Sequence, residues 1–251
     1  MKKLLTLVVL LLCTAFFASC IFDDDEPKWN AAEVCPEIGT NIYGMPNRGT
    51  FIDERDGREY KYTTIGNQVW MAENLKYEAE YSGCVTGDFA LNIYSSLVED
   101  SCDTKECKIN VFCEKYGRYY SLQEDGKYLS PRNQDLIDTI CPRGWHVPSE
   151  TEWNVLRDNM GADSHEAASR LKSADSLSYR PGYTPGSDDC LFSAKPSGGI
   201  GGMSGEEYVL LRSYYWTSTA RTHNIMFVYY LGDDAKTDCP LLKVPIRCLK
   251  D

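Results

Sequence analysis

The N-terminal segment constrains this chain more than any other feature, because it decides where the chain folds and therefore the state of its cysteines. MKKLLTLVVLLLCTAFFASC begins with Lys2 and Lys3, continues with an apolar stretch and ends in small residues. A basic head, a short apolar body and a small-residue end are typical of a secretory signal peptide. The apolar body is shorter than the roughly 20 residues that span a bilayer. We therefore predict that residues 1–19 are a cleaved signal.

The end of this segment predicts a lipid anchor. Phe17-Ala18-Ser19-Cys20 resembles the lipobox of bacterial lipoproteins, with Phe17 where Leu is usual. In a lipobox the cysteine is lipidated, with palmitate among its acyl chains, and becomes the first residue. We therefore expect Cys20 to anchor the chain in the outer membrane. The alternative is an ordinary signal peptide in which the cysteine occurs by chance.

The predicted export of the chain indicates that its cysteines form disulfides. Of the eleven cysteines, Cys13 lies in the predicted signal and Cys20 at the lipid site, which leaves nine. Disulfides are expected in an exported chain. Nine is an odd number, so at least one thiol is free, capped or bonded to another molecule.

The charge of the chain excludes one class of partner. Cleavage removes two lysines from 26 basic and 37 acidic residues, so the formal net charge changes from −11 to −13. A surface this acidic offers no basic face for phosphates, so we expect no nucleic-acid partner. The same charge disfavours electrostatic binding to anionic lipid.

Residues 20–45 are predicted to be a lipidated cysteine followed by an acidic tether. IFDDDEPKWN is an acidic run broken by Pro27, and like charges extend such a segment. The run resembles the export signal that sends some bacterial lipoproteins to the outer face of the outer membrane, although a plain solvated spacer is an equal alternative. From residue 46 to 251 the composition is globular and compatible with one domain.

The order of predicted elements in residues 46–251 favours an α+β domain with an antiparallel sheet. Hairpin strands are expected at Thr50–Asp53, Tyr60–Ile65 and Gln68–Met71, followed by a cysteine-rich insertion over about residues 80–115. Two helices follow, and then a loop at 180–205 and closing strands. These late elements lie in ETEWNVLRDNMG, SHEAASRLKSA, YYWTSTA, IMFVYYLG and LLKVPIRCL.

The stretch CPRGWHVPSETEW could be read as a catalytic site, but it is better explained as structure. Ser149 and Glu152 have the spacing of a capping box, so both are assigned to the start of a helix. Cys141 is expected in a disulfide rather than as a nucleophile, and His146 as a structural histidine. Trp145 and Trp153 are predicted to be core residues.

No motif in the chain predicts a cofactor or a metal. CDTKECKINVFC spaces its cysteines more widely than a zinc site, and the acidic turns DERDG and GDD lack the EF-hand pattern. The sequence also lacks a P-loop, G-x-S-x-G, H-E-x-x-H and the dinucleotide glycine pattern.

Aromatic residues give one candidate ligand site. The chain contains 17 tyrosines and five tryptophans, and several occupy adjacent positions in the predicted closing strands. Because neighbouring side chains of a strand point to opposite faces, some of these rings should be exposed and able to stack on sugars. The candidate platform comprises Tyr214, Tyr215, Trp216, Tyr229 and Tyr230.

Five segments in order resemble the Fibrobacter succinogenes major paralogous domain family: GTFIDERDGREYKYTTIGNQVWMAENLKY, CPRGWHVPSETEW, LFSAKPSGG, YYWTST and VPIRCLKD. The resemblance covers about residues 49–251, apart from the cysteine-rich stretch 84–113 and a loop at 133–139. It implies an exported lipoprotein but no particular activity. WHVPSETEW and VPIRCL are also similar to C-type-lectin-like and formylglycine-generating-enzyme-like folds, although the lectin calcium motifs are absent.

The lectin-like arrangement implies two disulfides. An outer bridge would join Cys141 to Cys248, and an inner bridge would join Cys190 to Cys239. The pairing of the remaining cysteines is left open, and one of them is expected to be unpaired. These five are Cys35, Cys84, Cys102, Cys107 and Cys113.

The sequence therefore predicts a non-catalytic lipoprotein of the cell surface. Its domain would serve a structural role or bind an extracellular glycan or protein. The alternative is an enzyme on a formylglycine-generating-type scaffold that uses a thiol or a metal.

Overall fold

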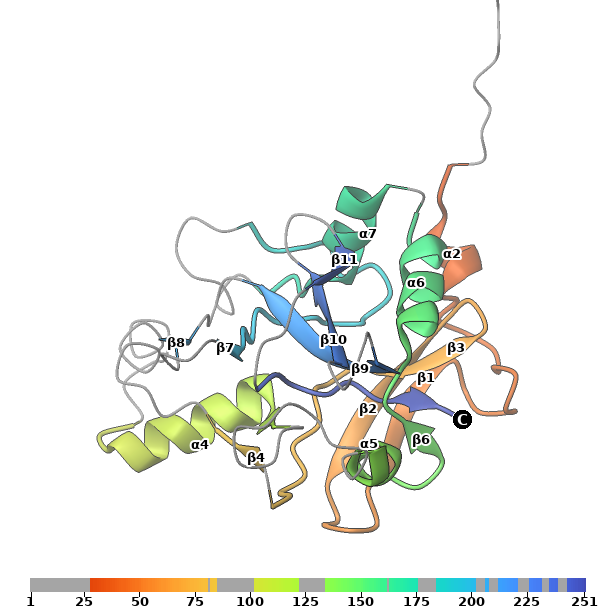
Figure 1. The fold of residues 1–251 in the computed structure, drawn as a ribbon. Coiled ribbons are helices and arrows are strands. Elements are labelled where there is room, and N and C mark those ends of the chain that lie inside the picture. The colour runs from red at the N-terminus through yellow and green to blue at the C-terminus, as the bar shows by residue number, and fades with distance from the viewer. Residues whose placement is uncertain are drawn as a thin grey trace, which may run out of the picture. The chain divides into compact units, whose positions relative to one another are not determined.

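The computed structural model shows the chain as two units, Met1–Asn30 and Ala31–Asp251, and the fold below is that of the second (Figure 1). No helix in the described part is long and apolar enough to cross a membrane. The structure describes residues 28–80, 82–84, 102–121, 134–161, 163–175, 184–201, 206–207, 212–220, 226–231, 235–238 and 243–251.

An antiparallel sheet brings the two ends of the domain together. In the described part it has five strands in the order β1-β2-β3-β12-β6, so the last strand lies between β3 and β6. The strands are β1 (Arg48–Ile52), β2 (Glu59–Ile65), β3 (Gln68–Met71), β6 (Trp145–His146) and β12 (Leu249–Lys250). The three predicted hairpin strands are confirmed to within two residues. The predicted strand over LLKVPIRCL is shorter than expected, because residues 245–248 precede β12 outside any strand.

A second antiparallel sheet has the order β11-β10-β9 and lies beside α6 and α7 (Figure 1). Its strands are β9 (Ser213–Ala220), β10 (Met226–Leu231) and β11 (Ala235–Asp238). Two short pairs complete the described strands: β4 (Ser82–Gly83) with β5 (Tyr119–Tyr120), and β7 (Ile200–Gly201) with β8 (Glu206–Glu207). The sequence analysis did not predict β11, whose residues alternate too weakly to show a strand period.

The described helices are α2 (Ala31–Val34), α4 (Lys105–Tyr116), α5 (Gln134–Ile140), α6 (Glu150–Asn159) and α7 (Ser164–Leu171). The capping box of α6 is confirmed: the Ser149 hydroxyl accepts from Glu152 N, and the Glu152 carboxylate accepts from Ser149 N. The helix α4 occupies the end of the cysteine-rich insertion, where the sequence showed little periodicity. Thr104 caps its first turn, and disulfides hold both of its ends.

The core is aromatic. Trp153 of α6 stacks on Tyr215 of β9 with ring centroids 5.1 Å apart, and Trp70 of β3 lies 4.6 Å from Trp153. Trp145 packs against Phe51 at 4.4 Å. Both Trp145 and Trp153 are buried, as predicted. Helices packed beside antiparallel sheets confirm the α+β class.

The predicted end of the tether at residue 45 does not coincide with the start of the compact unit. Residues 31–45, which the sequence analysis assigned to the tether, belong to the compact unit. The helix α2 leads directly to Cys35, which is 2% exposed and bonded to Cys190. The composition of this segment did not identify it as part of the compact unit. A disulfide and backbone hydrogen bonds hold it there, rather than a run of apolar residues.

Candidate functional site

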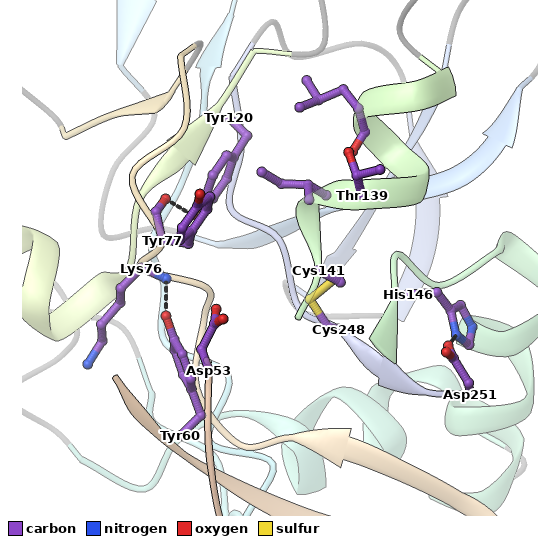
Figure 2. Close-up of a disulfide and its surroundings, with 12 residues drawn as sticks. Asp53, Tyr60, Lys76, Tyr77, Tyr120, Thr139, Cys141, His146, Cys248 and Asp251 are labelled. Carbon is purple, nitrogen blue, oxygen red and sulfur yellow. Dashed lines mark hydrogen bonds and ion pairs between the residues drawn. A yellow bond between two sulfur atoms is a disulfide. The ribbon is translucent and has the colours of Figure 1, made fainter. Parts of the chain in front are cut away.

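The predicted outer disulfide is confirmed. Cys141 and Cys248 are bonded, with their Cα atoms 6.0 Å apart (Figure 2). The bridge joins the residue that follows α5 to the residue that precedes β12. Cys141 is thus a structural cysteine.

The predicted inner disulfide is wrong, because Cys190 pairs with Cys35. Cys239 lies outside the described residues. The expectation of one unpaired thiol among the remaining five cysteines is also wrong, since the other bridges are Cys84–Cys113 and Cys102–Cys107. The inner pair was implied only by the lectin-like arrangement, and spacing alone does not determine connectivity.

The candidate aromatic platform does not form as predicted. Tyr215 and Trp216 are 0% and 2% exposed, so neither ring can stack on a ligand. Trp216 Nε1 donates to the Tyr120 carbonyl at 2.8 Å, while Tyr214 is half-buried. The side chains of Tyr229 and Tyr230 lie outside the described residues, as does Cys20.

His146 of CPRGWHVPSETEW lies against two carboxylates, an arrangement that fits the structural role expected of it. His146 Nε2 lies 3.1 Å from Glu152 Oε1, and Nδ1 lies 2.8 Å from Asp251 Oδ1. The hydrogen bond that His146 donates to Glu152 raises the pKa of His146, opposed by burial. No group of three or more potential metal ligands occurs in the described part of the chain.

The structure shows a different candidate site, a basic cavity of about 580 Å³. It lies between β1 and β2, the segment after β3, the end of α4 and the loop 191–195, elements that can be followed in Figure 1. Among the described residues that line it, Glu73 is the only acid. The cationic lining residues are Arg48, Lys61, Lys76, Lys115, Lys195 and Arg247. A concentration of positive charge in a chain of formal charge −11 indicates an anion site.

Arg247 forms the floor of this basic cavity. Its side chain is 1% exposed, and its Nε and Nη2 atoms donate to Asn74 Oδ1 at 3.0 and 2.5 Å. Nη1 donates to the carbonyls of Met71 and Phe192, and the guanidinium lies 4.6 Å from the Phe192 ring centroid. Burial lowers the pKa of Arg247. Among the described residues no carboxylate forms an ion pair with it.

Lys195 is the second buried cation of the cavity. Its Nζ donates to the Lys115 carbonyl at 3.2 Å, and no described carboxylate pairs with it. Burial lowers the pKa of Lys195, and the charges of Lys115, Lys76 and Arg247 lower it further. By contrast, Lys76 Nζ lies 3.7 Å from Glu73 and therefore has a local counter-charge.

A strained loop forms one wall of the cavity. Asp188, Leu191 and Ser193 have φ values of 53°, 56° and 54°, a region that residues other than glycine rarely adopt. Ser193 donates from its backbone N and its hydroxyl to Asp188 at 2.7 and 2.6 Å, and the Cys35–Cys190 bridge fixes the loop centre. Such strain costs about 1–3 kcal/mol per residue and clusters at functional sites.

Another wall of the basic cavity depends on the absence of a Cβ at Gly49. A Cβ at Gly49 would lie 2.7 Å from the hydroxyl of Tyr62, its cross-strand partner. Glycine therefore allows the Tyr62 ring to lie across β1 and line the cavity. Tyr62 is 6% exposed, and burial raises its pKa.

Comparison with known proteins gives a family. The matching family is described as Fibrobacter succinogenes major domain, and the match covers residues 63–250. The chain belongs to this family. No curated protein and no solved structure matches the chain.

The match places the cavity partly within the Fibrobacter succinogenes major domain. Lys195 and Arg247 lie inside the matched residues, whereas Arg48 and Lys61 of the first hairpin lie before them. The sequence analysis missed this site because its cations are distant in sequence. The nearest signal was KPSGG beginning at Lys195, a lysine in a loop of otherwise small residues.

Proposed function

We propose that this protein is a lipid-anchored protein of the outer membrane that faces the cell exterior and binds an anionic ligand in the basic cavity. The lipobox ending at Cys20 and the acidic run after it support the location. The ligand would be an extracellular glycan or protein that carries acidic groups.

The observation that carries the binding proposal is a pair of cations, one buried and one half-buried, that have no ion-pair partner among the described residues. Arg247 is 1% exposed and Lys195 is half-buried, and no described carboxylate lies within ion-pair distance of either. Burying an unpaired charge is costly, because the charge loses its hydration without an opposite charge in return. An anion bound in the cavity would supply that counter-charge.

The wider arrangement supports the same function. The donors of Arg247 are used by the protein itself, so this residue contributes charge rather than hydrogen bonds to a ligand. The ammonium group of Lys61 lies on the exposed side of the cavity and has no partner among the described residues. A ligand would therefore contact lysine ammonium groups and the Tyr62 hydroxyl, over a floor made positive by Arg247.

We also propose a C-type-lectin-like arrangement for the domain. The bridge between Cys141, before α6, and Cys248, before the last strand, supports it. So does the position of β12 within the sheet, which brings the end of the domain beside its first hairpin.

The alternative enzyme hypothesis would need a thiol or a metal site. The eight cysteines in the described part all lie in disulfides, so a thiol enzyme would have to use Cys239. No specific observation in the described part favours that reading over binding.

Calorimetry with the full chain in detergent tests the proposal. Acidic oligosaccharides and inorganic phosphate should bind, whereas the matched neutral oligosaccharides should not. The exposed-rim variant Lys61→Glu should weaken binding by about tenfold or more, as expected for reversing one charge near a ligand. Lys243→Glu makes the same charge change at an exposed lysine outside the cavity and is the control. Equal effects of both variants would contradict the cavity as the site.

A further inference from the structure

We propose that Lys195 is a reactive amine that forms an imine with the carbonyl group of a 2-oxo acid bound in the basic cavity. This inference rests on the anion-binding function proposed above and adds a covalent step to it.

An amine nucleophile must be uncharged for part of the time and accessible to its substrate. A lysine reaches this state when it is desolvated or placed beside other cations. Lys195 meets both conditions, because it is half-buried and lies in a cavity lined by Lys76, Lys115 and Arg247. These neighbours and its burial lower the pKa of Lys195. The charge of Asp175 opposes this shift, but no described carboxylate forms an ion pair with Lys195.

The hydrogen bonding of Lys195 leaves the amine free to react. Among the described residues, the acceptor for Lys195 Nζ is the Lys115 carbonyl at 3.2 Å. A neutral amine has two hydrogens and one lone pair, and a carbonyl can accept only a hydrogen. The bond to Lys115 therefore orients the amine and leaves its lone pair available toward the cavity.

The same surroundings select the substrate. The neighbouring cations that favour the neutral amine also attract a carboxylate to within a few ångströms of it. A 2-oxo acid carries its carbonyl carbon next to its carboxylate, so binding of the anion places the carbonyl beside Nζ. A cavity of about 580 Å³ is large enough for a 2-oxo acid that is considerably larger than pyruvate.

The reaction balances without an oxidant or a reductant. The Nζ lone pair attacks the carbonyl carbon, and the carbonyl π electrons move to oxygen. A proton passes from nitrogen to that oxygen to give a carbinolamine. The carbinolamine then takes up one proton from solvent and loses water, which leaves a protonated imine on Lys195 whose positive charge is balanced by the carboxylate of the substrate.

Reductive trapping tests the proposal on the full chain in detergent. Pyruvate and cyanoborohydride should convert Lys195 to a stable secondary amine, found by peptide mass mapping, at least tenfold faster than exposed Lys243. With acetone, a carbonyl compound without a carboxylate, the preference for Lys195 over Lys243 should be much smaller than with pyruvate. Acetate, a carboxylate without a reactive carbonyl, should slow the pyruvate reaction by competition.

The variant Lys195→Arg keeps the charge but cannot form an imine. It should lose the fast adduct, while phosphate binding is measured by calorimetry on the wild-type chain. Equal labelling of Lys195 and Lys243, or a fast adduct that persists in the variant, overturns the proposal. If trapping fails while phosphate still binds, only the imine is wrong, and loss of both results removes the anion site as well.

Discussion

The imidazole of His146 lies 2.8 Å from the carboxylate of Asp251, so a residue of β6 is joined to the residue that follows β12 (Figure 2). The other ring nitrogen faces Glu152, which closes the capping box of α6. One side chain thereby connects a strand, a helix start and the chain segment after the last strand. Both interactions are strongest when the ring is protonated.

This cluster predicts a dependence of stability on pH. The Glu152 hydrogen bond raises the folded-state pKa of His146 above its ordinary 6.5, although burial opposes the shift. The stability it contributes is therefore complete below pH 6.5 and is lost as pH rises through the higher folded-state value. Side chains exposed by about a third limit the effect to roughly 0.2–1 kcal/mol. Thermal melts from pH 5 to 9, in steps of about half a unit, should show the decline.

The variant His146→Gln should remove that decline, whereas His165→Gln should not, because His165 is an exposed residue of α7.

Burial alone would raise the pKa of Glu152, but His146 and Ser149 lower it to about 2. The stability from Glu152 is thus complete above its ordinary 4.5 and lost toward pH 2. An unchanged pH profile in His146→Gln would show that the cluster does not couple these elements.

A second prediction concerns the cap of α6. Ser149→Ala removes the hydroxyl that accepts from Glu152 N, so the free energy of unfolding should fall by about 0.5–2 kcal/mol. Because Ser149 does not line the basic cavity, phosphate binding by the folded protein should not change. Thr151→Ala, at an exposed position of the same helix, is the control for denaturant melts. Loss of binding without loss of stability would make Ser149 a functional residue.

Local patterns predicted the elements but not the site. Ser149 and Glu152 determine a helix start within four residues, and the hairpin turns are equally local, so these elements could be read directly. The α+β class follows from their order. The cavity instead needs Lys61, Lys195 and Arg247 to meet, and this depends on sheet order and loop path, which no local pattern encodes.

The disulfide pairings were likewise only partly predictable from the sequence. The Cys141–Cys248 bridge was predicted through resemblance to a known arrangement, whereas Cys35–Cys190 joins residues 155 apart in sequence and has no such guide. The placement of Tyr215 and Trp216 in an exposed aromatic platform was wrong for a related reason. Adjacent rings were assumed to alternate between core and solvent, but α6 and the segment near Tyr120 cover both faces of β9 at Tyr215 and Trp216.

A third prediction compares two bridges of different span. Cys141–Cys248 closes 107 residues, worth about 4.7 kcal/mol in the chain-entropy model, whereas Cys102–Cys107 closes five and is worth about 2 kcal/mol. Replacing the first pair by alanines should therefore lower the melting temperature far more than replacing the second. Similar losses measured by calorimetry would mean that the long bridge does not restrict the unfolded chain.

A fourth prediction concerns the anchor. Cys20→Ala should release the protein from the membrane fraction, because the lipid on Cys20 is the proposed anchor. External protease should cut the wild-type protein on intact cells if the domain faces outward. Membrane retention of Cys20→Ala argues against the anchor, and full protease resistance argues against outward exposure. Arg143→Ala, a change at an exposed residue, is the control for expression.

The last prediction tests the wall of the basic cavity. A Cβ at Gly49 would lie 2.7 Å from the Tyr62 hydroxyl and 2.9 Å from its ring carbon Cζ, so Gly49→Ala forces the ring to move. The ring already lines the cavity, so the displacement narrows the space available to a ligand. Overpacking of this kind costs about 1–3 kcal/mol of stability. Phosphate affinity should fall as well.

Gly83→Ala provides the matched control, because an added Cβ at Gly83 has no atom within 4 Å and Gly83 lies outside the cavity. It should leave phosphate affinity unchanged. Calorimetry and thermal melts on both variants separate the two effects. If Gly49→Ala lowers the melting temperature but binds phosphate as tightly as the wild type, the Tyr62 wall is structural and the ligand lies nearer to Lys195 and Arg247. If affinity falls in Gly49→Ala alone, the hairpin β1–β2 takes part in binding.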